Sequence, residues 1–169
     1  MDFQLAEAAG TEALGAALAR AAPWSRPQSL TVFLEGDLGS GKTTLARGLL
    51  RALGVTGTVR SPSYTLLESY APPGRQVLHL DLYRLNSAAE LEGLGLRDAL
   101  DPGVLLLVEW PERARAGLPL PDLEVGLSFS GEQRRAQLVS GSAAGAAWLA
   151  GLSADPLIQN KGELVALDR

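Results

Sequence analysis

The stretch that decides the fold is GDLGSGKTT, residues 36–44, which lies between the apolar run LTVFLE (residues 30–35) and the helix-like segment LARGLLRALG (residues 45–54). It matches the pattern GxxxxGK[ST] in its typical context, with a buried strand before the glycine loop and a helix after it. Glycines let successive backbone N–H groups turn toward one point, where the positive end of the helix dipole adds to them. The ligand that fits such a loop is a chain of phosphates, so the sequence predicts a nucleotide-binding P-loop.

The polar residues of this loop have distinct expected roles. Lys42 is expected to reach the β and γ phosphates, and Thr43 to hold Mg²⁺. Only two of the fifteen basic residues of the chain are lysines, and Lys42 is one of them. A compact ammonium on a flexible stem suits the inside of the loop, where a planar guanidinium would not replace it. The residues expected to contact ATP are Gly36, Asp37, Leu38, Gly39, Ser40, Gly41, Lys42, Thr43 and Thr44.

Cleavage of a phosphate also requires carboxylates near the metal, because the loop supplies only positive charge. Glu109 follows the apolar run VLLLV, so a parallel strand would carry it to the sheet edge where the loop lies. Asp81 lies in VLHLDLYRL, in which apolar residues alternate with polar ones that include His79. Asp81, Glu109 and Lys42 are therefore the expected catalytic residues, with Glu109 in the Walker B position. His79 is expected to be a hydrogen-bonded strand histidine rather than a catalyst.

Composition narrows the class of protein. A chain of 169 residues suits one domain, and its net charge of −4 argues against naked nucleic acid as the main partner. With no cysteine and one histidine, thiolate and His-rich zinc sites are excluded. The acidic N-terminus is unlike a signal peptide, and no apolar run approaches the length of a membrane span. We therefore expect a cytoplasmic protein that does not interact with membranes.

The remaining pattern predicts an α/β fold: a P-loop NTPase-like single domain with a mixed β-sheet flanked by helices. We expect an ATPase domain over residues 1–152 and a C-terminal tail of uncertain structure over residues 153–169. Thr11 is expected to N-cap the first helix, and Gly54 to close the second. Helical segments are expected over residues 11–22, 44–53, 87–100 and 143–152. Strands are expected over residues 3–5, 30–35, 64–70, 76–85, 104–108, 123–129 and 135–140, with hairpins joining 64–70 to 76–85 and 123–129 to 135–140.

Four motifs in this order, GDLGSGKTT, RSPSYTLLESY, HLDLYRL and LLVEWPER, resemble the TsaE (YjeE) family of bacterial ATPases. The resemblance covers about residues 10–140, and the last three motifs at these spacings are specific to that family. It implies a P-loop α/β domain that hydrolyses ATP to ADP and phosphate. It also implies a role in forming threonylcarbamoyladenosine at position 37 of tRNA, with activation by the partner proteins TsaB and TsaD and only indirect contact with tRNA.

The same resemblance implies roles for individual residues. Glu109 would bind the magnesium ion, Asp81 would act in the metal shell or position water, and Trp110 would lie near the base or sugar of the nucleotide. Residues 61–65 would form a switch-like segment that senses the γ-phosphate, with Ser63 and Thr65 as nucleotide contacts. The family usually shows SPTYTL or SPTFTL, and Ser63 here replaces the first threonine with its hydroxyl retained.

Two alternative functions remain open from the sequence. A small-molecule or nucleoside kinase would use residues 111–117, which contain Arg113 and Arg115, as a lid over the phosphates. A nucleotide-dependent binding switch would use NKGE, residues 160–163, which faintly resembles the guanine-binding NKxD of GTPases. The final acid of that stretch is Glu and no clear strand precedes it, so we interpret it as a surface turn.

Overall fold

The central strand, β2 (Leu30–Glu35), leads directly into the glycine loop and is buried along most of its length. It pairs in parallel with β5 (Val104–Glu109) on one side and with β6 (Leu123–Ser130) on the other. A strand that is buried on both faces has a continuous apolar sequence, which is why LTVFLE predicted this position. The expected strand over residues 30–35 is confirmed.

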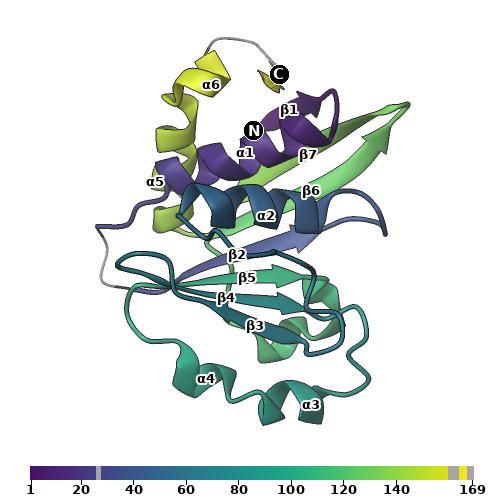
Figure 1. Cartoon of the computed structure of the whole chain (residues 1–169), viewed down its shortest axis with the longest axis vertical. Helices are drawn as coiled ribbons and strands as arrows, with labels where there is room; N and C mark the ends of the chain where they lie inside the picture. The colour runs from purple at the N-terminus through teal and green to yellow at the C-terminus, as the bar shows by residue number, and fades with distance from the viewer. Residues whose placement is uncertain (26–27, 160–163, 167–169) are drawn as a thin grey trace.

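The structure, a computed structural model, describes residues 1–25, 28–159 and 164–166 (Figure 1). The other strands are β1 (Asp2–Leu5), β3 (Leu67–Tyr70), β4 (Gln76–Asp81), β7 (Gln133–Ser140) and β8 (Leu164–Ala166). The helices are α1 (Ala8–Ala21), α2 (Lys42–Ala52), α3 (Ala88–Gly93), α4 (Leu96–Ala99), α5 (Ala143–Ser153) and α6 (Pro156–Gln159), with 3₁₀ turns η1 (Pro111–Arg113) and η2 (Arg115–Gly117).

Within these ranges one mixed sheet has the strand order β3-β4-β5-β2-β6-β7-β1-β8. The strands β4, β5, β2 and β6 are parallel neighbours, and the remaining neighbouring pairs are antiparallel. Both expected hairpins are present, as β3–β4 and β6–β7. The predicted α/β domain with a mixed sheet flanked by helices is thus confirmed.

Two helices begin earlier than the sequence predicted. Helix α1 begins at Ala8 with Glu7 in the N-cap position, so the expectation that Thr11 caps it is wrong, and Thr11 lies buried inside the helix. Alanines at its start have high helix propensity, so the helix forms soon after the chain leaves β1. Helix α2 begins at Lys42 rather than at Thr44, because the last glycine of the loop already occupies the N-cap position.

The first hairpin is shorter than expected. The expected strand over residues 64–70 begins only at Leu67, because Leu66 has a left-handed backbone with φ of 62° that turns the chain. The expected strand over residues 76–85 ends at Asp81. The shortening matters for the site, since it leaves the carboxylate of Asp81 at the end of β4, just before a turn at residues 83–84.

Apolar side chains cover both faces of the sheet. Helices α1, α2 and α5 pack on one face, where Leu18, Leu49 and Trp148 are fully buried. Helices α3 and α4 cover the opposite face through Leu91 and Leu96, and Figure 1 shows them at the lower end of the view, away from α1 and α2. The parallel strands that lead to the loop are therefore shielded on both sides.

Helices α1 and α2 lie side by side (Figure 1), and glycines allow this close approach. A methyl group on Gly48 of α2 would lie 2.2 Å from the carbonyl oxygen of Glu12, and one on Gly15 of α1 would lie 2.2 Å from the carbonyl oxygen of Leu45. Real side-chain atoms do not approach backbone this closely, so the helices would have to separate.

We expect Gly48→Ala to lower the free energy of unfolding by about 2 kcal/mol or more, because overpacking between rigid elements forces the backbone to shift. Urea denaturation measures the change. Gly57→Ala is the matched control: Gly57 is exposed and no atom lies within 4 Å of an added methyl group, so its effect should stay within about 0.5 kcal/mol. Equal effects of the two substitutions would show that the helices do not meet at Gly48.

The chain beyond α5 joins the same fold. Asp155 accepts two hydrogen bonds from Arg20 of α1, at 2.9 Å and 3.1 Å, and Ile158 of α6 is buried in the core. Strand β8 pairs antiparallel with β1. The boundary placed after residue 152 stays a prediction, and the NKGE stretch at residues 160–163 lies outside the described residues. In the ranges that the structure describes, no helix is long and apolar enough to cross a membrane.

Candidate functional site

The glycine loop joins β2 to α2 and encloses the side chain of Lys42. The Nζ atom of Lys42 donates hydrogen bonds to the carbonyl oxygens of Gly36 at 2.6 Å and Asp37 at 2.9 Å. Although Lys42 is only 4% exposed, its partners are backbone carbonyls rather than a carboxylate. Ser40 in the same loop has a buried hydroxyl with no partner among the described residues. The loop therefore holds an ammonium group and a free hydroxyl that an anionic ligand can engage.

The first glycine of the loop is required by its surroundings. Gly36 has φ of 131°, and a methyl group there would lie 2.1 Å from the carbonyl oxygen of Leu127 in β6. A side chain at this position would both strain the backbone and separate the loop from the neighbouring strand. The sheet thus fixes where the loop begins.

Burial lowers the pKa of Lys42 below its ordinary value of 10.5. The carboxylates of Glu109, Asp81, Glu112 and Asp37 oppose this shift, because negative charge nearby favours the protonated amine. The amine is thus partly desolvated, and the four carboxylates act on it through their charge rather than through hydrogen bonds. A bound phosphate chain would add the strongest counter-charge to this position.

The sheet brings together Glu109 and Asp81, the two carboxylates that the sequence offers as catalytic residues. The strand register places Asp81 of β4 opposite Glu109 of β5, and Leu34 of β2 opposite Glu109 on the other side. Glu109 is 2% exposed and Asp81 is 4% exposed. Oε2 of Glu109 accepts a hydrogen bond of 3.0 Å from the hydroxyl of Thr43. A hydroxyl and a carboxylate thus meet at the carboxyl edge of the parallel strands, beside the glycine loop.

Asp81 connects the expected switch segment to the site. Its carboxylate accepts hydrogen bonds from the hydroxyl of Ser61 and, at 3.0 Å, from the backbone N–H of Tyr83. Its own backbone N–H donates to the carbonyl oxygen of Leu66 at 3.1 Å. Movement of residues 61–66 would therefore change the hydrogen bonds that hold Asp81 in place.

The two hydroxyl residues expected to contact the nucleotide lie in that segment. Ser63 is half-buried and Thr65 is exposed. Thr65 also lines a cleft of about 460 Å³ together with Ser61 and Tyr64. Contact of Ser63 and Thr65 with a nucleotide stays a prediction.

Trp110 covers the ammonium of Lys42. The Nζ atom lies 3.8 Å from the centroid of the indole ring, and the Tyr83 ring lies 5.0 Å from the same indole. The backbone of Trp110 is left-handed, with φ of 59°, an unfavourable geometry for a large residue that the end of β5 imposes. This position is at the Lys42 end of the loop. Whether Trp110 also contacts the base or sugar of a nucleotide stays a prediction.

Two residues beside the loop were missed by the sequence reasoning. A methyl group on Gly41 would lie 3.3 Å from Cγ2 of Thr11 and 3.6 Å from Cδ of Arg134. The Oγ1 atom of Thr11 and the Nε atom of Arg134 are both buried without a partner in the described structure. Such atoms call for a ligand or water. Thr11 was interpreted as a helix cap, and Arg134 lies in a hairpin strand that carries no motif.

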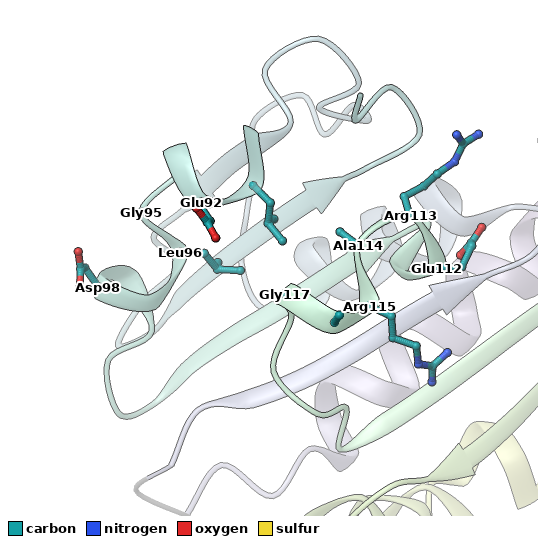
Figure 2. A pocket seen from close by; sticks show the side chains of 11 residues that line it. Glu92, Gly95, Leu96, Asp98, Glu112, Arg113, Ala114, Arg115 and Gly117 are labelled. Atoms are coloured by element: carbon teal, nitrogen blue, oxygen red, sulfur yellow. The ribbon is translucent and has the colours of Figure 1, made fainter. Parts of the chain in front are cut away.

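A cleft of about 630 Å³ lies between α3–α4 and the η1–η2 segment (Figure 2). Leu91 and Leu96 contribute to its wall, and Ala114 and Gly117 face them from the other side. None of the residues that line this cleft belongs to the glycine loop. It is therefore separate from the candidate phosphate site, although η1 follows Trp110 directly in the chain.

The donors at the loop fit a magnesium ion. In the described part of the chain, no three His, Cys, Asp or Glu side chains form a cluster that could hold a metal. Magnesium does not need such a cluster at a nucleotide site, because it keeps several waters and binds phosphate oxygens with one or two protein ligands. The hydroxyl of Thr43 and the carboxylate of Glu109, already 3.0 Å apart, are oxygen donors of the right kind.

The fold and the site together define a P-loop NTPase-like domain: a central parallel strand, a glycine loop that encloses a lysine, and a hydroxyl–carboxylate pair at the same sheet edge. A family model described as "Threonylcarbamoyl adenosine biosynthesis protein TsaE" matches residues 5–137. The chain therefore belongs to the TsaE family.

Individual relatives agree with this assignment. A protein from Haemophilus influenzae named "tRNA threonylcarbamoyladenosine biosynthesis protein TsaE" is 42% identical over 113 residues, which cover 67% of this chain and 72% of the relative. Proteins with the same name from Synechocystis and Bacillus subtilis are 39% identical over 117 residues (67% and 71% of the two chains) and 36% identical over 102 residues (60% and 63%). The crystal structure of Bacillus subtilis YdiB superposes with a TM-score of 0.72 and 25% identity, over 90% of this chain and 93% of that one.

Proposed function

We propose that this chain is a magnesium-dependent ATPase that hydrolyses ATP to ADP and phosphate in support of tRNA threonylcarbamoyladenosine biosynthesis. The observation that carries the proposal is the contact between Thr43 and Glu109 beside the loop that encloses Lys42. This arrangement offers a positive group for phosphate and two oxygen ligands for a metal at one sheet edge. Membership of the TsaE family supports the role in tRNA modification.

In this proposal each group has one task. Lys42 binds the β and γ phosphates, and residues 36–44 wrap the phosphate chain with backbone N–H groups. Thr43 and Glu109 hold magnesium, which neutralises charge on the transferring phosphoryl group when bound. Asp81 orients water, and its link to residues 61–66 makes that segment responsive to the γ-phosphate. Thr11 and Arg134 offer polar atoms to the rest of the nucleotide.

We further propose that TsaB and TsaD activate the hydrolysis and that the chain contacts tRNA only indirectly, in the cytoplasm. The net charge of −4 supports indirect contact, because a protein that binds tRNA by itself needs a positive surface to displace counterions. An acidic subunit suits a complex in which other members bind the nucleic acid.

The kinase alternative has less support. It would use Arg115 as part of a lid over the phosphates, but this guanidinium is engaged elsewhere: it donates to Glu35 at 2.9 Å and to Glu124 at 2.7 Å. Hydrogen bonds with these two carboxylates raise the pKa of Arg115. The η2 turn is therefore attached to the last residue of β2 and to the beginning of β6, and Arg115 is not free to close over the loop.

The test is ATP turnover by the chain alone, with small alcohols or nucleosides, and with TsaB and TsaD added. We expect slow phosphate release alone and at least about tenfold faster release with both proteins, since completing a catalytic site by conformational closure raises the rate. Boiled partner proteins are the control. Stimulation by a small acceptor with transfer of phosphate to it, and none by the two proteins, would establish the kinase instead.

A further inference from the structure

His79 is fully buried in β4 and contacts the expected metal ligand. Its Nε2 atom lies 2.9 Å from Oε1 of Glu109, and its exposed fraction is 0%. In the strand register His79 lies opposite Leu107, two residues before the position where Asp81 faces Glu109. His79 and Asp81 therefore project from the same face of the strand, toward the acid of the neighbouring strand.

The contact fixes the tautomer of His79. An ionised carboxylate can only accept hydrogen bonds, so the proton of a neutral imidazole must be on Nε2 for this contact to form. The Nδ1 atom is buried and has no partner in the described structure, which suits an unprotonated nitrogen better than an N–H group. The Nε2–H group of the ring therefore donates to Glu109.

Both oxygens of Glu109 are thereby restrained. Oε1 is held by His79 from within the sheet, and Oε2 is held by Thr43 at the mouth of the loop. A buried carboxylate held at one oxygen keeps the other directed outward, toward the hydroxyl with which it would share a metal. Hydrogen-bond partners that orient metal ligands in this way typically change metal affinity 10- to 100-fold when they are removed.

We propose that His79 is a positioning residue that holds Glu109 in the orientation that binds magnesium. The inference rests on the proposed function, because it assigns Glu109 to the metal. His79 touches neither phosphate nor water in this role and acts through Glu109 alone.

The experiment is the affinity for ADP measured by calorimetry, once with EDTA and once with Mg²⁺. In His79→Leu we expect ADP affinity in EDTA to stay within about twofold of the wild type, while the gain on adding Mg²⁺ falls about tenfold or more. His79→Gln, whose amide can donate to Glu109, should recover part of the gain. In a Glu109→Gln background, His79→Leu should cause no further loss, because the two residues act as one unit.

The results separate the two proposals. If Mg²⁺ does not raise the ADP affinity of the wild type, the proposed metal-dependent ATPase site is wrong. If it does, and His79→Leu shows the same gain, only the positioning role is wrong. Since His79 is the single histidine of the chain, ¹⁵N NMR of the wild type gives a readout that does not depend on any variant folding. A proton on Nε2 is expected, and a proton on Nδ1 with Nε2 bare would overturn the inference.

Discussion

Lys42→Ala is expected to lower the affinity for ATP about a hundredfold, which corresponds to about 2.7 kcal/mol. The ammonium of Lys42 is almost completely buried and is held by two backbone carbonyls of the loop. Removal of one member of a buried, charged pair costs about 2–5 kcal/mol, since the other member, here phosphate, stays desolvated without its partner. Calorimetric titration with a non-hydrolysable ATP analogue measures the loss.

Stability should rise or stay the same in a variant that keeps the Lys42 stem and loses only the charge. Burial lowers the pKa of Lys42 in the folded chain, so the unfolded chain binds this proton more tightly. The resulting cost is present at neutral pH and is relieved as pH rises from the lowered pKa toward the ordinary value of 10.5. Lys42→Met, which keeps the stem but not the charge, should therefore match or exceed the wild-type melting temperature while losing ATP affinity. Unchanged ATP affinity in either variant would place the phosphate site elsewhere.

The sequence predicted the site best where the same residues must have both a particular backbone geometry and a particular chemistry. Residues 36–44 could be predicted because a glycine loop between a buried strand and a helix has few other physical uses. Glu109 could be placed because an acid at the end of a fully apolar run must emerge at the carboxyl edge of a parallel sheet. The register that sets Asp81 opposite Glu109 could not be placed in this way, because it depends on β4 and β5 being neighbours in the sheet.

Side-chain partnerships across the fold could not be predicted in the same way. The contact between His79 and Glu109 depends on which strands are neighbours, and the local pattern of β4 carries no information about that. Thr11 and Arg134 meet at Gly41 from α1 and β7, which are separated by most of the chain. The left-handed backbone of Leu66 also has no sequence signal, because such geometry in a residue other than glycine is imposed by tertiary contacts.

Glu109→Gln is expected to reduce ATP turnover in the presence of TsaB and TsaD at least about a hundredfold, or about 2.7 kcal/mol in the barrier. The amide keeps the size of the side chain and can still contact Thr43, but it lacks the negative charge that the proposed magnesium ligand would need. Metal-free nucleotide affinity should stay the same or rise slightly, because one carboxylate near the phosphates has been neutralised. The loss should therefore appear in kcat and in the gain of nucleotide affinity on adding Mg²⁺, and not in metal-free ATP binding.

Glu112→Gln is the matched control for charge alone. Glu112 is exposed, and like Glu109 it raises the pKa of Lys42 through its charge, but it makes no contact with Thr43. If Glu109 acted only by tuning the field around Lys42, both substitutions would slow turnover to a similar degree. A direct metal ligand predicts instead that Glu112→Gln stays within about twofold of the wild type, since exposed charges are screened by solvent. Phosphate release at saturating ATP and Mg²⁺ distinguishes a direct metal ligand from an effect of charge alone. Turnover at the wild-type rate in Glu109→Gln would show that Glu109 does not bind the metal.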